Sequence, residues 1–451
     1  MKKKLFGTDG IRGKANQYPI TPEIAMLVGK ATAKVLGGGS GHKRVVLGKD
    51  TRISGYMLEN AITSGLLSMG MDVLAVGPMP TPAVAHLTRS MGAVCGIMIT
   101  ASHNPACDNG IKIFAEDGFK LPDSIELEIE KEMLEGTLAE EGVPCENIGK
   151  AYRIEDARGR YIEYAKGSIQ NLSLRGLRIV LDCANGAAYS IAPLIFRELG
   201  AEVIETAVRP DGLNINDGCG ALYPENIGRL VREHRADAGI ALDGDADRVI
   251  FCDANGEEVN GDRIIGMLAL AYQRERKLAS DTIVVTGMSN LGLMRAMKQA
   301  GINVEVTDVG DRYVIERMRG GSFNVGGEQS GHIIFMDYAT TGDGQLTALQ
   351  FLDVLARSGK KASELASVCP QYPQVLLNVA VSHERGVKDA IMASDALSAA
   401  IAEEEGKLSG EGRVLVRPSG TEALIRVMVE AKTEQIALLA AENLVNVIKM
   451  L

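Results

Sequence analysis

The chain contains no tryptophan, and aromatic residues make up only 4% of its 451 residues. Proteins that bind single-stranded nucleic acids without sequence preference depend on exposed aromatic side chains, on which the bases stack. The net charge of −10 also disfavours a polyanionic partner, because the field of the whole protein repels it. We therefore expect no nucleic acid partner, although a local cluster of Arg and Lys still allows a small anion to bind.

Three further features are missing from the sequence. No run of residues is long and apolar enough to span a bilayer, so we expect no membrane contact. The basic start, Lys2-Lys3-Lys4, is not followed by the apolar stretch of a signal peptide, which predicts a cytoplasmic protein. The seven cysteines include no C-x-x-C pair, which disfavours a zinc site or a disulfide framework and predicts free thiols.

One unit of sequence occurs three times. With 46% apolar and 24% charged residues, the chain has the composition of a globular protein, and its length exceeds what one core supports. Residues 43–77, 177–206 and 282–309 each read as a strand, a polar loop, a helix, a glycine and a second strand. Alternating strands and helices indicate α/β domains, and the glycine after each helix suits a left-handed C-cap.

Each copy is followed by a further apolar run that ends in a polar loop, at residues 100–105, 243–248 and 327–332. In open α/β sheets, ligands bind at the ends of strands. After Pro370 the pattern changes to strands and two helices, 387–408 and a last one capped by Thr433. We therefore predict three similar α/β domains with mixed sheets and a smaller C-terminal α+β domain around one central cleft. The predicted domains are residues 1–153, 154–254, 255–370 and 371–451.

The second polar loop carries three aspartates, Asp243, Asp245 and Asp247. Alternate side chains of an extended segment share a face, so their carboxylates are predicted to converge. Such a cluster suits a hard cation, Mg²⁺ or Ca²⁺. An EF-hand needs Gly and Glu where this loop has Arg248 and Ala254, so a calcium loop of that type is excluded. A solvated acidic turn is the alternative.

Ser102 lies in the first polar loop, after the apolar run 95–99. Its hydroxyl can carry a phosphoryl group, and no Ser-His-Asp order surrounds it. The side chain of its neighbour, His103, is expected to point away from it. A serine shortly before a proline is also a common turn or cap residue, so the hypothesis of a phosphoryl carrier depends on all the loops together.

The third polar loop offers a carboxylate, a hydroxyl and an imidazole, from Glu328, Ser330 and His332. These groups can bind sugar hydroxyls and move protons, and a glycine-rich turn is the alternative.

A fourth loop lies in the C-terminal part and begins at Arg417. Its guanidinium, the hydroxyls of Ser419 and Thr421, and the backbone at Gly420 are typical of a phosphate-binding nest, with Arg426 further along. An ordinary turn is the alternative here as well. The loop lacks the Lys and the length of a P-loop, so we expect no nucleotide.

With these four loops in this order, the chain resembles the α-D-phosphohexomutase superfamily over essentially its whole length. The loops are similar, in chain order, to its phosphoserine, metal, sugar and phosphate loops. The opening motif FGTDGIRG, residues 6–13, looks most like that of bacterial phosphoglucosamine mutases. Gln329 stands where glucose- and mannose-type members tend to carry Met. Ala423 replaces a common Pro, which removes no phosphate ligand.

The resemblance implies an isomerase, a phosphohexose mutase that acts by intramolecular phosphotransfer. Ser102 would be a phosphoserine, and one Mg²⁺ would bridge its phosphate to Asp243, Asp245 and Asp247. The phosphoryl group would pass to glucosamine 6-phosphate and form glucosamine 1,6-bisphosphate. The return of the other phosphoryl group to Ser102 would leave glucosamine 1-phosphate, a precursor in amino sugar, UDP-N-acetylglucosamine and peptidoglycan synthesis.

The resemblance also implies roles for residues of the other loops. Glu328 and Ser330 would bind the sugar hydroxyls, and Lys112 and His332 match positions proposed for general acid and base. Phosphoryl transfer needs positioning and neutralisation of oxygen charge, to which Arg12, Arg52 and Arg248 would contribute. The non-reacting phosphate would be bound by the fourth loop and its neighbour: Arg417, Ser419, Gly420, Thr421 and Arg426.

Three other functions stay open. A phosphoglucomutase or phosphomannomutase would use the same scaffold. A magnesium-dependent sugar phosphatase would use the same aspartates without the fourth loop. A sugar-phosphate sensor would bind without turnover and would tolerate the loss of the Ser102 hydroxyl. In each case we expect a small sugar phosphate as partner, and the oligomeric state is open, with a homodimer among the alternatives.

Overall fold

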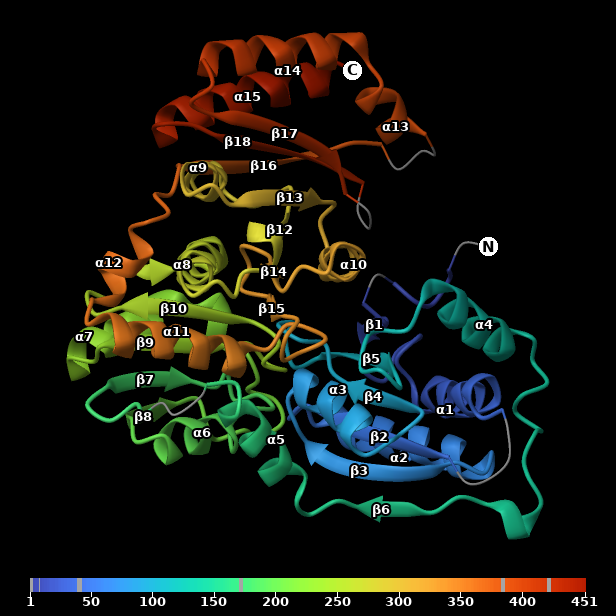
Figure 1. The fold of residues 1–451 in the computed structure, drawn as a ribbon. Helices are drawn as coiled ribbons and strands as arrows, with labels where there is room; N and C mark the ends of the chain where they lie inside the picture. The colour runs from blue at the N-terminus through green and yellow to red at the C-terminus, as the bar shows by residue number, and fades with distance from the viewer. Residues whose placement is uncertain (1–2, 8, 39–42, 170–172, 383–385, 420–422) are drawn as a thin grey trace. The chain divides into compact units, whose positions relative to one another are not determined.

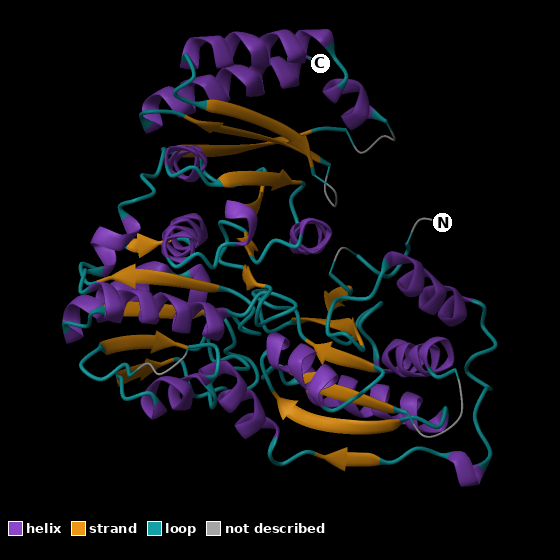
Figure 2. Cartoon of the chain, viewed as in Figure 1, coloured by secondary structure: helices purple, strands orange, loops and turns teal. Residues whose placement is uncertain are grey.

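A computed structural model describes residues 3–7, 9–38, 43–169, 173–382, 386–419 and 423–451 of the chain (Figures 1 and 2). By its internal contacts the chain divides into two compact units. The large unit comprises residues 1–287 and 303–367, and the C-terminal unit comprises residues 288–302 and 368–451. Among the described residues, no helix combines the length and the apolar character needed to cross a bilayer.

The predicted repeat is present in the large unit as three sheets that share one topology. In each sheet two strands pair in parallel, a third strand pairs in parallel with the first, and a fourth pairs antiparallel with the third. The strands, in that order, are β2 (Arg44–Lys49), β3 (Asp72–Pro78), β4 (Cys95–Ile99) and β5 (Asp108–Ala115); β7 (Arg178–Asp182), β8 (Glu202–Thr206), β9 (Ala238–Leu242) and β10 (Val249–Asp253); and β12 (Thr282–Thr286), β13 (Asn303–Thr307), β14 (Val325–Gly327) and β15 (Ile333–Phe335). Each of the first three polar loops therefore joins the third strand of a sheet to the fourth.

Three short strands extend the first two sheets. They are β1 (Ile11–Lys14) beside β5, β6 (Ala151–Arg153) beside β3, and β11 (Glu258–Val259) beside β10. All three sheets thus mix parallel and antiparallel pairs, as predicted. Every residue of β4, β9 and β12 is buried, which fits central strands that are covered on both faces.

The helices of the large unit pack on these sheets and on one another. They are α1 (Pro22–Leu36), α2 (Ser54–Ser68), α3 (Thr81–Ser90), α4 (Asp123–Leu134), α5 (Ala157–Lys166), α6 (Ala192–Glu198), α7 (Pro224–His234), α8 (Gly261–Arg274), α10 (Asp311–Gly321), α11 (Gly344–Ser358) and α12 (Ala362–Ala366), with the short 3-10 helices η1 (Cys145–Asn147), η2 (Gly220–Leu222) and η3 (Ala279–Asp281). Helix α1 begins after Thr21, whose hydroxyl accepts the amide of Ile24 at 3.4 Å. It lies close to α2 because Gly29 and Gly65 have no side chain: a Cβ on Gly29 would lie 2.5 Å from the Ile62 carbonyl oxygen.

The glycine after each repeated helix adopts the predicted left-handed conformation. The φ angles of Gly70, Gly200 and Gly301 are 83°, 95° and 72°. The seven cysteines are free thiols, also as predicted, and Cys107 and Cys145 are exposed.

The C-terminal unit contains an antiparallel sheet in the order β16 (Gln374–Ala380), β18 (Leu424–Glu430) and β17 (Arg413–Pro418). Its helices are α9 (Leu291–Gln299), α13 (Val387–Met392), α14 (Asp395–Leu408) and α15 (Glu434–Met450). Thr433 caps α15 as predicted, with its hydroxyl 3.3 Å from the amide of Ile436. The prediction of one helix over 387–408 was wrong, because Ser394 is extended (ψ 131°) and starts a new helix there. The α+β character of this part is confirmed.

Candidate active site

The first polar loop holds Ser102 in a strained backbone conformation between β4 and β5. The φ angle of Ser102 is 52°, in the left-handed region that costs a residue with a Cβ about 1–2 kcal/mol. Its amide donates to the Thr100 hydroxyl at 2.9 Å, and that hydroxyl donates to Asp50 at 2.7 Å. Ser102 is only 1% exposed. Buried polar contacts therefore hold the conformation in place.

The second polar loop turns sharply between β9 and β10. The amide of Ala246 donates to the carbonyl of Asp243 at 3.0 Å, and Ala246 has a φ of 57°. This turn, rather than alternation along an extended chain, directs the three aspartates to one place. Asp243, Asp245 and Asp247 are buried, and each offers a carboxylate oxygen within 4.8 Å of the others. The predicted convergence is confirmed, and its predicted geometric reason was wrong.

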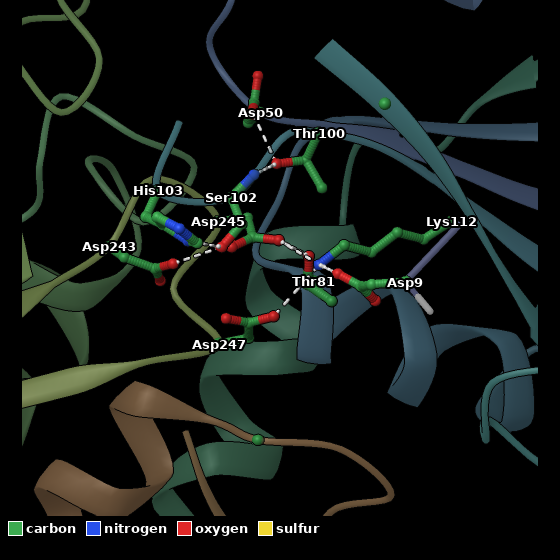
Figure 3. A network of polar contacts seen from close by, with 12 residues as sticks. Asp9, Asp50, Thr81, Thr100, Ser102, His103, Lys112, Asp243, Asp245 and Asp247 are labelled. Carbon is green, nitrogen blue, oxygen red and sulfur yellow. Dashed lines mark hydrogen bonds and ion pairs between the residues drawn. The ribbon is translucent and has the colours of Figure 1, made fainter. Parts of the chain in front are cut away.

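The carboxylate cluster meets Ser102 (Figure 3). The Ser102 hydroxyl donates to Oδ2 of Asp243 at 2.8 Å. Oδ1 of Asp245 and Oδ1 of Asp247 are buried and have no hydrogen-bond partner among the described residues. Buried carboxylate oxygens without donors are costly unless a cation binds them, and Mg²⁺ prefers such ligands. The three aspartates therefore fit a divalent cation.

Positive side chains surround the aspartates on one side. Nζ of Lys112, on β5, lies 3.0 Å from Asp245, 3.3 Å from Asp247 and 3.2 Å from Asp9. Asp9 also pairs with Lys120 at 2.5 Å and with Arg12. The predicted site residues Lys112 and Arg12 thus lie in one charge network with the metal-loop aspartates.

The three aspartates are not equivalent electrostatically. Burial, followed by the negative charges of Asp247 and Asp245, raises the pKa of Asp243 well above its usual range. Burial acts in the same direction on Asp245, but Lys112 and a hydrogen bond from Thr81 outweigh it and lower the pKa of Asp245. The positive charge already present is therefore concentrated beside Asp245, and the burial of Asp243, the partner of Ser102, is not offset in the same way.

His103 lies beside Ser102 instead of pointing away from it. Its Nδ1 is 3.3 Å from the Ser102 hydroxyl and accepts a hydrogen bond from Nη1 of Arg248 at 2.7 Å. Because a guanidinium only donates, Nδ1 carries no proton in this contact. Burial, followed by the charges of Arg248 and Arg12, lowers the pKa of His103 to about 4. His103 is therefore neutral near pH 7.

The third polar loop lies between β14 and β15. Glu328 accepts the amide of Gly310 at 3.2 Å, and burial raises its pKa. His332 is buried: its Nε2 accepts the amide of Gly342 at 3.3 Å and lies 3.5 Å from Asp311, while its Nδ1 has no partner among the described residues. Ser330 is exposed. The amide of Val249, directly after the metal loop, donates to the carbonyl of Gly331 at 3.0 Å, so this loop and the metal loop are neighbours.

The fourth polar loop belongs to the C-terminal unit. Arg417 of β17 and Arg426 of β18 are directly opposite each other in the hairpin. Burial, followed by the charge of Arg426, lowers the pKa of Arg417. Ser419 is 4% exposed, and its carbonyl accepts Nζ of Lys388 at 2.7 Å. Like charges in opposite positions are unfavourable, so an anion would stabilise this pair. The remaining two predicted ligands, Gly420 and Thr421, lie outside the described residues.

Some residues at the site were not identified from the sequence. Thr81, the first residue of α3, donates its hydroxyl to Oδ2 of Asp245 at 2.6 Å and its amide to the Asp245 carbonyl at 2.9 Å. Asn216, in the loop between β8 and η2, donates to the Ser102 carbonyl at 2.9 Å. No local pattern marks either residue, because their partners lie far away in sequence. Arg52, expected to supply charge to the reaction, is fully buried and donates to Asp50 and to backbone carbonyls.

Comparison with known families matches four consecutive parts of the chain. Residues 3–140, 159–256 and 260–372 match the α/β/α domains I, II and III of the phosphoglucomutase/phosphomannomutase family, and residues 376–447 match its C-terminal domain.

Individual proteins are similar over almost the whole chain. A phosphoglucosamine mutase of Geotalea daltonii is 54% identical over 95% of this chain and 94% of its own length. One of Syntrophotalea carbinolica is 53% identical over 100% of this chain and 98% of its own length. In fold, the chain is similar to a phosphoglucomutase/phosphomannomutase family protein of Burkholderia thailandensis (TM-score 0.81, 24% identity, 99% and 97% of the two chains). It is also similar to the N-acetylphosphoglucosamine mutase of Aspergillus fumigatus, solved with GlcNAc-6P and magnesium (TM-score 0.69, 20% identity, 100% and 96% of the two chains).

Proposed function

The chain belongs to the phosphoglucomutase/phosphomannomutase family, whose members are phosphohexose mutases, and on that premise we propose that it interconverts glucosamine 6-phosphate and glucosamine 1-phosphate. The choice of sugar is supported by relatives above 50% identity that bear the name phosphoglucosamine mutase. The phosphoserine mechanism is supported above all by one contact: the Ser102 hydroxyl meets Asp243 at 2.8 Å within the cluster of three buried carboxylates.

Ser102 is the phosphoryl carrier in this proposal. The phosphoryl group leaves Oγ of phosphorylated Ser102 as its O–P bond breaks, and a new bond forms to O1 of glucosamine 6-phosphate, which loses its proton. The product of this step is glucosamine 1,6-bisphosphate. In the second step the phosphoryl group on O6 returns to Oγ of Ser102, O6 regains a proton, and glucosamine 1-phosphate leaves. Each cycle thereby returns Ser102 to its phosphorylated form.

Asp243, Asp245 and Asp247 would hold one Mg²⁺ in this proposal, and two of their oxygens, Oδ1 of Asp245 and Oδ1 of Asp247, have no other donor among the described residues. When bound, the ion would neutralise phosphate oxygen charge beside Ser102. Lys112, Arg12 and Arg248 add fixed positive charge on the protein side. Because phosphoryl transfer needs positioning and charge neutralisation more than covalent assistance, this arrangement suits the reaction.

His332 and Lys112 are the candidates for proton transfer. The amide of Gly342 donates to Nε2 of His332, so a neutral ring carries its proton on Nδ1, which has no partner among the described residues. That nitrogen is available to a sugar hydroxyl. Lys112, with three carboxylates around its ammonium group, is suited to stabilise developing negative charge.

Glu328 and Ser330 bind sugar hydroxyls in this proposal, with Gln329 as the residue expected of a glucosamine-type enzyme. Arg417 and Arg426 bind the non-reacting phosphate between their opposed guanidinium groups, together with Ser419, Gly420 and Thr421. The division into four domains at residues 153, 254 and 370 is part of the same proposal, as is a cytoplasmic location.

Two measurements made together test this function. Intact-protein mass reports the phosphorylation of Ser102, and a coupled assay compares turnover of the 6-phosphates of glucosamine, glucose and mannose. We expect a phosphorylated fraction and the highest kcat/KM for glucosamine 6-phosphate. A preference for glucose or mannose would keep the mechanism and change the substrate. An unmodified Ser102 without turnover of any of the three sugars would refute the proposal, and binding without turnover would favour a sensor.

A further inference from the structure

The carbonyl oxygen of Ser102 accepts two hydrogen bonds from residues that stand far apart in the sequence. Nη2 of Arg52 donates at 2.9 Å, and Nδ2 of Asn216 donates at 2.9 Å. Arg52 is 0% exposed and Asn216 is 7% exposed. Two buried donors therefore fix the carbonyl group of Ser102, the residue with the strained φ angle.

The same two side chains also hold the end of the loop. Nη2 of Arg52 donates to the carbonyl of Asn104 at 2.8 Å, and Nδ2 of Asn216 donates to the same oxygen at 3.1 Å. Nη1 of Arg52 donates to the carbonyl of Pro105. A guanidinium and an amide thus bridge the carbonyls of residues 102 and 104, which lie on either side of His103.

Arg52 is itself fixed by contacts that return to the loop. Its Nε and its amide both donate to Asp50 at 2.9 Å. Asp50 accepts the Thr100 hydroxyl at 2.7 Å, and that hydroxyl accepts the amide of Ser102 at 2.9 Å. The contacts form a closed ring through Arg52, Asp50, Thr100 and Ser102, part of which is visible in Figure 3. Each side-chain nitrogen of Arg52 thus donates to a protein oxygen, and none of these contacts is made with the three aspartates of the metal loop.

Asn216 lies in the loop that follows β8 of the second sheet, and it connects the loop of Ser102 to the metal loop. Its own amide is fixed by the carbonyl of Ala184 at 2.9 Å. A Cβ on Gly244, between the first two aspartates of the metal loop, would lie 2.6 Å from the Ser102 carbonyl oxygen and 2.8 Å from Nδ2 of Asn216. The backbone of the metal loop therefore lies directly against the bridged carbonyl, and only glycine fits there.

We propose that Arg52 and Asn216 are positioning residues that hold the phosphoserine loop through its carbonyls and so fix the Ser102 hydroxyl against Asp243. Without these donors, the strained peptide at Ser102 can relax and its Oγ can move away from the carboxylate cluster. The proposal assigns no contact with the substrate to either residue. It deepens the proposed phosphoryl-carrier function of Ser102 and rests on that function where turnover is measured.

The test compares Asn216→Ala with the matched control Asn226→Ala. Asn226 also donates its side-chain amide to a loop carbonyl, that of Gly218 at 2.8 Å, but contacts neither Ser102 nor Asn104 in the structure. We expect Asn216→Ala to lower kcat on the order of 10²-fold with KM for the sugar phosphate unchanged, because small displacements of a reacting group have such effects. Asn226→Ala should retain wild-type kcat. Asn216→Asp keeps the shape but replaces the donor by an acceptor, and should not rescue kcat.

Amide hydrogen exchange of peptides covering residues 98–108 provides a readout that needs no turnover. Both Asn216 variants should exchange faster than wild type in this segment, and Asn226→Ala should not. Arg52→Lys should do the same if it folds, since an ammonium cannot bridge three carbonyls and Asp50. If it does not fold, the Asn216 variants decide alone.

The outcomes separate this proposal from the proposed function. Unchanged exchange of residues 98–108 in Asn216→Ala, or a rise in KM at constant kcat, would overturn the positioning role. Should the wild-type protein show no mutase activity, the proposed function fails, and the exchange data alone decide about the positioning role: faster exchange supports it and unchanged exchange overturns it.

Discussion

The region around Ser102 and the region around Arg417 cluster side chains of opposite charge. Around Ser102, in the large unit, three aspartates are buried beside donors of the protein, as Asp245 is beside Lys112 and Thr81. In the C-terminal unit, Arg417 and Arg426 are directly opposite each other in the β17–β18 hairpin, so two positive side chains are brought together there. A group that takes part in bond breaking needs a fixed position. A group that anchors a phosphate needs mainly positive charge, which the second region concentrates in one arginine pair.

The largest expected effect follows from removal of the cation that the buried carboxylates are proposed to hold. Chelation with EDTA should abolish turnover, and added Mg²⁺ should restore it. Asp245→Asn should lower kcat on the order of 10³-fold, because a bound metal contributes several kcal/mol to transition-state stabilisation. The matched control is Asp217→Asn, because Asp217 is exposed and lies outside the cluster. Calorimetry should show wild-type affinity of this variant for Mg²⁺. Equal losses in both variants would contradict the assignment of the metal site.

A buried carboxylate elsewhere in the large unit should make stability depend on pH. Asp343 caps α11, accepts the Tyr161 hydroxyl at 2.8 Å, and has a pKa raised to about 6, chiefly by burial. Because this folded value exceeds the unfolded one, its stabilising contribution is present below about pH 4 and is lost as pH rises through 6. Thermal unfolding midpoints of Asp343→Asn relative to wild type should therefore rise between pH 4 and 7, by the equivalent of about 3 kcal/mol at most. A difference that does not vary with pH would contradict the shifted pKa.

Removal of one guanidinium from the anchoring region should weaken substrate binding and leave the chemical step nearly intact. Arg417→Gln should raise KM roughly tenfold or more, since a hydrogen bond to a charged group contributes about 1.5–3 kcal/mol. Its kcat at saturating substrate should change much less. The matched control is Lys432→Gln, because the ammonium group of Lys432 pairs with the exposed Glu411. Arg413→Gln is not suitable, because Arg413 pairs with the buried Glu430. A fall in kcat without a rise in KM would contradict the anchoring role.

The smallest expected effect concerns stability. Because Arg417 and Arg426 are opposed like charges, Arg417→Gln should stabilise the C-terminal unit by a few tenths of a kcal/mol while it impairs binding. Thermal unfolding in the absence of phosphate measures this, and added phosphate should stabilise wild type more than the variant. A destabilised variant would show that the pair is not a source of strain in the free protein.

Local sequence patterns predicted the repeat well because each copy contains its own signals for the starts and ends of strands and helices. Short apolar runs marked the strands, and Gly70, Gly200 and Gly301 marked the helix ends, where φ is indeed positive. The prediction failed where a single residue interrupts a helical pattern, as at Ser394. Nothing in the composition around Ser394 distinguishes an interior serine from an N-cap before the three-dimensional packing is known.

For the site, the sequence indicated the candidate residues that the structure brings together, Ser102 and the three aspartates, and missed the residues that hold them in place. Ser102 and the three aspartates stand in short motifs, so their chemistry is readable locally. Thr81 and Asn216 act on partners more than 100 residues away, which no local pattern encodes. The position of His103 beside Ser102 was missed for a related reason, since the left-handed backbone at Ser102 changes the usual divergence of adjacent side chains.

The transfer of the phosphoryl group itself tests the central claim most directly. Enzyme carrying a radioactive phosphoryl group on Ser102 is mixed with unlabelled glucosamine 6-phosphate and stopped within a single turnover. The account predicts that the label leaves Ser102 at least as fast as glucosamine 1-phosphate forms, and that it is found in the sugar phosphates. Formation of glucosamine 1-phosphate while the label stays on Ser102 would contradict the account.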